Sequence, residues 1–211
     1  MTIEEVLNRE LTALLKEPIA VIGASRTDSG VHARGNVAVF DTENRMPADK
    51  ICFALNQRLP EDIRVQTSEE VPAEWHPRKA NCTKTYEYKV LNRKISMPLE
   101  RLYAHFCYFN LDLNKMREAA AYLVGEHDFK SFCGNKKMKK TTVRTITDIG
   151  FRQQGSRLHI YFTGNGFLQQ MVRILTGTLI EVGMGKCEPG KMYDILTAQD
   201  RQAAGPTAPA Q

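Results

Sequence analysis

Residues 21–40 read "VIGASRTDSGVHARGNVAVF", a long polar turn between two short apolar runs at residues 19–22 and 37–40. Apolar runs of this length are typical of strands. A turn that only joined two strands could be much shorter. The longer turn contains three side chains that can take part in chemistry, those of Arg26, Asp28 and His32. The turn is therefore a candidate functional site.

Asp28 has two interpretations. An aspartate in the sequence TDSG most often accepts hydrogen bonds from backbone N–H groups in its own turn. Asp28 also follows an apolar strand, however, where catalytic loops gather. In an extended segment Arg26 would project to the same side as Asp28. His32 could orient a neighbouring group or stabilise the turn.

Composition favours a globular protein of one large or two small domains, because 42% of the 211 residues are hydrophobic and 25% are charged. No apolar run reaches the ~18 residues of a membrane helix, and the N-terminus has no signal-peptide core.

The five cysteines include no CxxC pair, which favours a cytoplasmic protein with reduced, buried thiols. The five histidines show no HxxxH or HExxH spacing, so we expect no metal. The net charge of +5 mildly favours an anionic partner.

Helices and strands are expected to alternate irregularly along the chain. The spacing of Thr2 and Glu5 is that of a capping box at the start of a first helix. Apolar periodicity predicts helices over residues 3–15, 47–63, 113–125, 167–183 and 192–198. It predicts strands over residues 19–22, 37–40, 64–67, 84–91, 102–108, 142–151 and 158–164. This order favours an α+β fold with a largely antiparallel sheet, in an N-terminal half (1–100) and a C-terminal half (101–211).

Residues 83–90, "TKTYEYKV", form a second candidate segment. Tyr86 and Tyr88 would share one face of a strand, with Lys84 beside them. The two tyrosines are either ordinary cross-strand aromatics or a surface for base stacking beside a phosphate-binding lysine.

Arg173 is the only charged residue between Phe167 and Ile180. Its neighbours three and four residues away in a helix are not acidic, and a buried unpaired charge costs several kcal/mol. Arg173 therefore either extends to the surface or meets an acid from another segment. A carboxylate in the polar turn, such as Asp28, would suit, and the arginine would keep it ionised.

Residues 133–145, "CGNKKMKKTTVRT", carry a cluster of basic side chains. A run of charge is commonly a solvated face, but the flanking Gly, Asn and Thr residues suggest a loop that leads into a strand. Such a loop could contact phosphates. The cluster comprises Lys136, Lys137, Lys139, Lys140 and Arg144.

Six segments together give this chain a family resemblance. They are GASRTDSGVHA, KTYEY, GEHDFKSF, TVRTI, FTGNGFLQQMVRI and DRQAAGPTAPA, at residues 23–33, 84–88, 125–132, 142–146, 162–174 and 200–210. In order and spacing they resemble tRNA pseudouridine synthases of the TruA type over essentially the whole chain. The resemblance implies a pseudouridine synthase fold, in which two α/β halves share a mostly antiparallel mixed sheet with a central cleft.

The resemblance also implies roles for individual residues. Asp28 matches the nucleophilic aspartate, Arg173 the arginine paired with it, and Arg26 an arginine that helps to hold the nucleotide out of the stack. Tyr86 matches the tyrosine that stacks on the target uracil, and we expect His32 and Lys84 to bind substrate beside it. Contacts to the RNA backbone are expected from Lys136, Lys137, Lys139 and Lys140.

The implied activity is isomerisation of uridine to pseudouridine in the tRNA anticodon stem-loop, at sites of the 38–40 type. The family acts as a homodimer, without a metal or an organic cofactor.

Members of the family begin with a strand and a "YDGxxxxGWQ"-like loop before the first helix, and they end with a strand after GPTAPA. This chain has neither, so the alternative is a truncated, catalytically weak tRNA-binding module. An aspartyl-phosphate enzyme is a more distant alternative, because the turn offers only one carboxylate for Mg²⁺.

Overall fold

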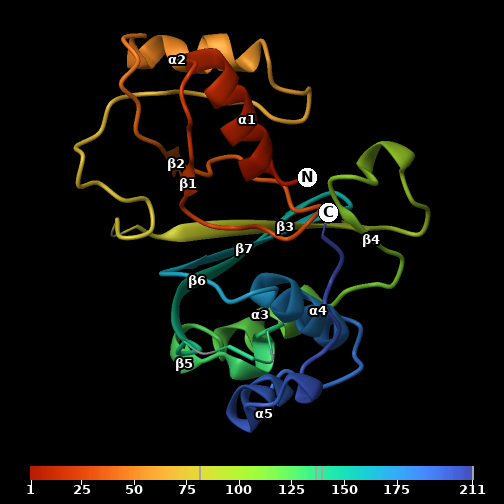
Figure 1. Ribbon diagram of the computed structural model, residues 1–211. Coiled ribbons are helices and arrows are strands. Elements are labelled where there is room, and N and C mark those ends of the chain that lie inside the picture. The colour runs from red at the N-terminus through yellow and green to blue at the C-terminus, as the bar shows by residue number, and fades with distance from the viewer. Residues whose placement is uncertain (81, 136, 139, 211) are drawn as a thin grey trace. The chain divides into compact units, whose positions relative to one another are not determined.

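The computed structural model describes residues 1–80, 82–135, 137–138 and 140–210, and the chain divides into two compact units (Figure 1). The first unit consists of residues 1–27 and 33–81, and the second of residues 28–32 and 82–211. Five residues of the polar turn thus belong to the second unit, although the chain on both sides belongs to the first. The strand predicted at residues 84–91 also lies in the second unit, together with the chain after residue 100.

The first unit is built on two helices and a short β-ribbon. The ordered elements are α1 (Ile3–Leu15), β1 (Ile22–Gly23), β2 (Ala38–Val39) and α2 (Ala48–Asn56). The predicted capping box is present, since Thr2 Oγ1 accepts from Glu5 N at 3.2 Å and Glu5 Oε2 accepts from Thr2 N at 2.6 Å. One buried apolar cluster holds the first unit together. Its residues come from both helices, from the segment after α1 and from the chain after α2: Val6, Leu11, Leu15, Ile19, Val21, Ile51, Leu55 and Leu59.

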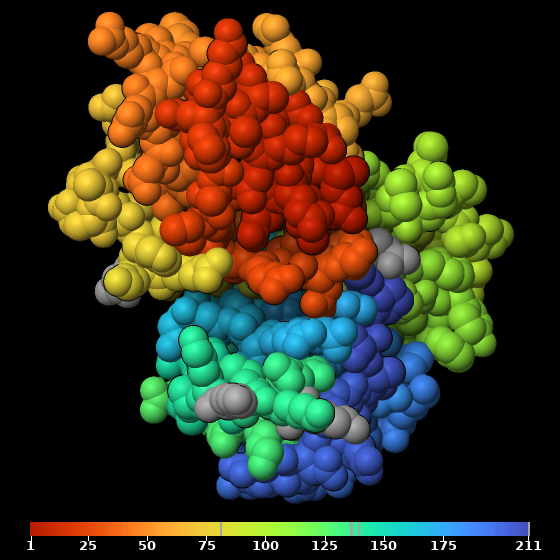
Figure 2. Space-filling model, in the orientation of Figure 1, coloured from red at the N-terminus to blue at the C-terminus, as the bar shows by residue number. Residues whose placement is uncertain are grey.

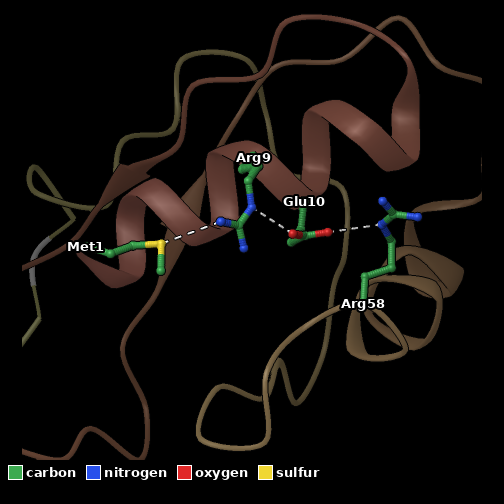
Figure 3. A network of polar contacts seen from close by, with 4 residues as sticks. All are labelled: Met1, Arg9, Glu10 and Arg58. Carbon is green, nitrogen blue, oxygen red and sulfur yellow. Dashed lines mark hydrogen bonds and ion pairs between the residues drawn. The ribbon is translucent and has the colours of Figure 1, made fainter.

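Glu10 links the two helical regions of the first unit. It accepts from Arg9 Nε at 2.8 Å and from Arg58 Nε, just beyond α2, at 3.2 Å. Figure 3 shows the carboxylate between the two guanidinium groups, with Arg9 also reaching the sulfur of Met1. The hydrogen bond from Arg9, together with the charges of both arginines, lowers the pKa of Glu10.

The strand predicted over residues 64–67 is wrong, because no strand forms there. The backbone of Val65 instead pairs with the side chain of Asn56: Val65 N donates to Oδ1 at 2.9 Å, and Nδ2 donates to Val65 O at 2.8 Å. A side-chain amide thus replaces the neighbouring strand that the β-rich sequence would otherwise need.

The second unit is organised around a five-stranded sheet in the order β4-β3-β7-β6-β5. β3 and β4 are parallel, and the other neighbouring pairs are antiparallel. The strands are β3 (Lys84–Asn92), β4 (His105–Cys107), β5 (Gly125–Asp128), β6 (Val143–Gln154) and β7 (Arg157–Gly164). The α+β class and the mostly antiparallel mixed sheet are therefore confirmed. In the described residues, β1 and β2 form a separate two-stranded sheet.

Three helices cover one face of the five-stranded sheet (Figure 1). They are α3 (Leu113–Ala121), α4 (Met171–Gly183) and α5 (Lys191–Ala198), and short 3₁₀ turns occur at η1 (Pro98–Glu100), η2 (Lys130–Phe132) and η3 (Arg201–Ala203). Alternate residues of the central strands point towards the helices, including Tyr88, Val90, Leu158, Ile160 and Phe162. The core is therefore a sheet packed against helices, with α4 almost entirely buried.

Several predicted boundaries shift for local reasons. α4 begins four residues later than predicted, because Gln170 adopts a left-handed conformation with φ of 59°. Gly125 begins β5 with φ of 115° and does not directly end α3, which stops at Ala121. β4 starts at residue 105 because a turn closes before it, in which Tyr103 N and Ala104 N donate to Glu100 O.

Within the described ranges, no helix is long and apolar enough to cross a membrane. All five cysteines are free. Cys52, Cys107 and Cys133 are buried, whereas Cys82 is exposed and Cys187 is half-buried, so the prediction that the thiols are buried is wrong for these last two.

Candidate active site

The centre of the site is an ion pair between Asp28 and Arg173. Arg173 Nη1 donates to Asp28 Oδ2 at 2.8 Å, across 145 residues of sequence. The side chain of Asp28 is 25% exposed and that of Arg173 is 20% exposed, so the pair is largely shielded but still accessible from solvent. Of the two sequence interpretations of Arg173, the structure matches the one in which a distant acid meets the arginine.

The segment at residues 206–210 orients Arg173 from the other side. Arg173 Nε donates to the Ala208 carbonyl at 2.8 Å, while Ala208 N donates back to the Arg173 carbonyl at 3.0 Å. Close approach of this segment requires Gly177 on α4, because a Cβ there would overlap with the Pro206 carbonyl. The guanidinium is thus held by a backbone acceptor and a carboxylate at once, which fixes its plane.

Tyr88 connects the same segment to the sheet. Its hydroxyl donates to the Pro209 carbonyl at 2.9 Å. Burial raises the pKa of Tyr88, an effect that the nearby charge of Arg173 partly opposes. The phenol therefore stays protonated and keeps its role as a donor. β3 and α4 are in this way joined through residues 208 and 209.

Tyr86 lies two residues before Tyr88 on the same face of β3, about 7 Å along the strand. Its ring meets Phe167 edge-on, with ring centroids 5.1 Å apart and planes at 75°. Tyr86 is half-buried, whereas Tyr88 is buried in the core. Lys84 begins β3 opposite Gly164 of β7 and is also half-buried. One strand therefore carries Lys84, Tyr86 and Tyr88, of which Tyr88 contacts the segment that holds Arg173.

The turn that carries Asp28 is closed by its own backbone, since Val31 N donates to Asp28 O at 3.1 Å. Gly30 has φ of 85°, a conformation in which a side chain would be strained, and it lies against Ala210. His32 Nε2 donates to the Leu102 carbonyl at 2.8 Å, and its ring stacks on Tyr103. In this structure His32 therefore anchors the turn to residues 102–103.

The basic segment is only partly described, because Lys136 and Lys139 lie outside the described residues. Lys137 and Lys140 are exposed. The first residues of the segment contact the chain just before α4. Gly134 N donates to Gln169 O at 2.9 Å, and a side chain at Gly134 would overlap with Gln170. Two exposed lysines thus follow directly on a segment fixed to the helix that carries Arg173.

Arg26 belongs to the first unit, where its side chain is exposed. Its predicted role beside Asp28 stays a prediction. In the described parts of the chain, no three His, Cys, Asp or Glu side chains gather where they could hold a metal ion.

Three contacts of the site were missed at the level of sequence. Ala208 and Pro209 contribute backbone carbonyls, which leave no side-chain signature. Phe167 stands in the motif GNGF, six residues before Arg173, and its place beside Tyr86 was not foreseen.

Comparison with known proteins adds an independent observation. A family model described as tRNA pseudouridine synthase matches residues 1–78 and 119–211. Proteins named tRNA pseudouridine synthase A from Thermoanaerobacter sp. (strain X514) and Brevibacillus brevis are 42% and 44% identical over 211 residues, which cover 100% of this chain and 86% of each relative. The protein of that name from Halalkalibacterium halodurans is 42% identical, over 98% of this chain and 80% of its own length.

Proposed function

Because the chain belongs to the tRNA pseudouridine synthase family, whose members are isomerases, we propose that it converts uridine to pseudouridine in tRNA. The observation that carries the proposal is the 2.8 Å contact between Asp28 and Arg173. A lone, accessible carboxylate held by a guanidinium suits a reaction that needs an ionised acid at a fixed position.

Asp28 is the nucleophile in this proposal. Its carboxylate bonds to the substrate, the C1′–N1 bond of the uridine breaks, the uracil turns, C5 bonds to C1′, and the bond to Asp28 breaks again, which frees the carboxylate. The hydrogen on C5 leaves as a proton and N1 gains one, so the reaction is balanced without an oxidant, a reductant or an energy source. Arg173 stabilises the negative charge of Asp28 before the attack and keeps the carboxylate pointing to one place.

The target base must first leave the helical stack, which costs a few kcal/mol. Tyr86 offsets part of this cost, because stacking of a base on an aromatic ring contributes about 1–3 kcal/mol. The edge-on contact with Phe167 supports this role, since it fixes the orientation of the tyrosine ring. Arg26 helps to hold the nucleotide out of the stack, and Lys84 and His32 contribute to the surroundings of the bound nucleotide.

The basic segment binds the RNA backbone, and its charge acts independently of sequence. The substrate region is the anticodon stem-loop, at sites of the 38–40 type, and the enzyme acts as a homodimer. These finer points rest on the family resemblance of the six sequence segments.

The test is release of tritium from tRNA labelled with [5-³H]uridine, because each pseudouridine formed frees one hydrogen from C5. Unmodified transcripts that carry uridine at only one of positions 38, 39 and 40 assign the site. Release in proportion to those uridines supports the proposal. A protein that binds the transcripts but releases no tritium is instead the alternative, a tRNA-binding module of the same fold.

A further inference from the structure

A surface hollow of about 290 Å³ lies directly beside the turn that carries Asp28. It is lined by Gly30, His32, Arg101 and Leu102. Its volume is several times the roughly 30 Å³ that a water molecule occupies in the liquid. All four lining residues belong to the second unit, and two of them are within four residues of Asp28 in the chain. A ligand group in this hollow would therefore adjoin the catalytic turn.

The wall of the hollow is fixed by specific contacts. On one side, His32 Nε2 donates to the Leu102 carbonyl at 2.8 Å, and the rings of His32 and Tyr103 stack with centroids 5.0 Å apart. On the other side, Glu100 pairs with Arg157 on β7, whose Nε donates to it at 3.0 Å. Residues 100–103 are thus attached both to the turn and to the sheet. Figure 2 shows the yellow-green part of the chain, to which residues 100–103 belong, at the surface of the second unit.

Among the described residues that line this hollow, Arg101 is the one whose side chain is an ordinary cation. Its guanidinium carries five N–H donors. Among the described residues it makes one hydrogen bond, from Nη1 to the Pro98 carbonyl at 3.1 Å, and no carboxylate pairs with it. The adjacent acid, Glu100, is already engaged by Arg157. The remaining donors of Arg101 are available to an anion, and phosphate suits them well.

Tyr103 does not line the hollow itself, but its ring stacks on His32, which does. One face of its ring lies on His32, yet the residue is 55% exposed. An aromatic ring that is supported on one face and open elsewhere can stack with a base. A phosphate-binding arginine next to such a ring is the combination that recognises a single nucleotide of an unpaired strand.

We propose that this hollow and the ring of Tyr103 beside it form a second nucleotide subsite, in which Arg101 binds the phosphate next to the target uridine and Tyr103 stacks on the neighbouring base. His32 is a positioning residue that holds residues 102–103 against the turn. The inference deepens the proposed function, on which it rests, because it states how the nucleotide beside the target is held.

The first experiment measures equilibrium binding, by fluorescence anisotropy, of a labelled anticodon stem-loop RNA with uridines at positions 38–40. We expect Arg101→Ala to weaken binding about tenfold and to reduce the slope of log K against log salt by about 0.7, the value for one contact to a single strand. Arg101→Lys should restore most of both. The matched control is Arg93→Ala, which removes the same charge outside the hollow and should change affinity less than twofold. Equal losses for Arg93→Ala and Arg101→Ala would overturn the proposal.

The second experiment locates the phosphate. A neutral methylphosphonate is placed at each linkage of the loop in turn. One linkage flanking the target uridine should weaken binding to the unaltered protein but not to Arg101→Ala, since the contact is already lost there. If every linkage has the same effect on both proteins, Arg101 binds no particular phosphate and the proposal fails.

The base contact has its own pair of variants. Tyr103→Phe keeps the ring and should bind normally, whereas Tyr103→Ala should weaken binding about tenfold. Equal affinity of these two variants would rule out stacking. All of these measurements need binding and not turnover. If the unaltered protein binds the RNA but releases no tritium, the proposed isomerase activity fails while the subsite is still tested.

Discussion

Arg173 and Ala208 hold each other through two reciprocal hydrogen bonds. The side chain of Arg173 donates to the carbonyl of Ala208, and the backbone N–H of Ala208 donates to the carbonyl of Arg173. The same guanidinium then reaches Asp28. The position of the acid therefore depends on a backbone segment that bears no functional side chain of its own.

Asp28→Asn should abolish tritium release while leaving RNA affinity within about twofold. The amide keeps the size of the side chain and can still accept a hydrogen bond from Arg173, but it is no nucleophile. Release and anisotropy measurements on the same preparation check both halves of the prediction. Substantial turnover by this variant would end the assignment of Asp28.

Arg173→Lys should reduce the rate at least tenfold and lower the free energy of unfolding by about 1–3 kcal/mol. Lysine keeps the charge but has no planar fork to bind Asp28 and the Ala208 carbonyl together. Urea denaturation measures the stability. The control is Lys191→Met, which removes a largely exposed ion pair with Asp194 and should cost less than about 0.5 kcal/mol. Arg173→Lys with unaltered kinetics would argue against a positioning role for the fork.

Tyr86→Phe should retain most of the activity, because the ring and its contact with Phe167 remain. Tyr86→Leu should lose about ten- to a hundredfold in kcat/KM, the range expected when one stacking interaction is removed. Steady-state kinetics on the stem-loop RNA compare the two variants. Equal rates would mean that Tyr86 is only part of the core.

Gly177→Ala should destabilise the second unit by about 1–3 kcal/mol and also slow turnover. The added methyl group meets the Pro206 carbonyl, so the segment that holds Arg173 must move. Gly190→Ala is the matched control, because a Cβ there meets nothing within 4 Å. Should Gly177→Ala keep full activity despite a measured loss of stability, the orientation of Arg173 would not depend on this segment.

Stability should decrease below about pH 6.5 through His105. Burial lowers the pKa of this histidine in the folded protein, so the unfolded chain binds a proton first as the pH falls. The contribution is fully present above the ordinary pKa and is lost towards the lower, folded value. Denaturation midpoints at pH 7.5 and 5.5 should therefore differ less in His105→Gln than in the unaltered protein. An equal difference in both proteins would assign the pH dependence to other groups.

Much of this fold follows from local sequence signals. The capping-box spacing of Thr2 and Glu5 predicts the first helix, and the alternating side-chain pattern around Tyr86 and Tyr88 predicts β3. The signals fail where a contact is not local. Val65 lies in a β-rich run, yet it pairs with the side chain of Asn56, and no pattern within residues 64–67 contains that partner.

The candidate site divides in the same way. Arg173 could be linked to a distant acid because it is an isolated charge in an apolar helix, and the contact with Asp28 is present. The carbonyls of Ala208 and Pro209 could not be foreseen, since every residue has a carbonyl. The attachment of His32 to Leu102 depends on how two loops meet, 70 residues apart in the chain.

The long separation of Asp28 and Arg173 has a consequence for synthesis on the ribosome. At 5–20 residues per second, roughly 7–29 s pass between the addition of the aspartate and the addition of its arginine partner. Throughout that interval the nascent chain carries the acid without the cation that positions it. If Asp28 is the nucleophile, as proposed, an emerging polypeptide has no assembled reaction centre with which to modify the transfer RNAs that surround it during translation.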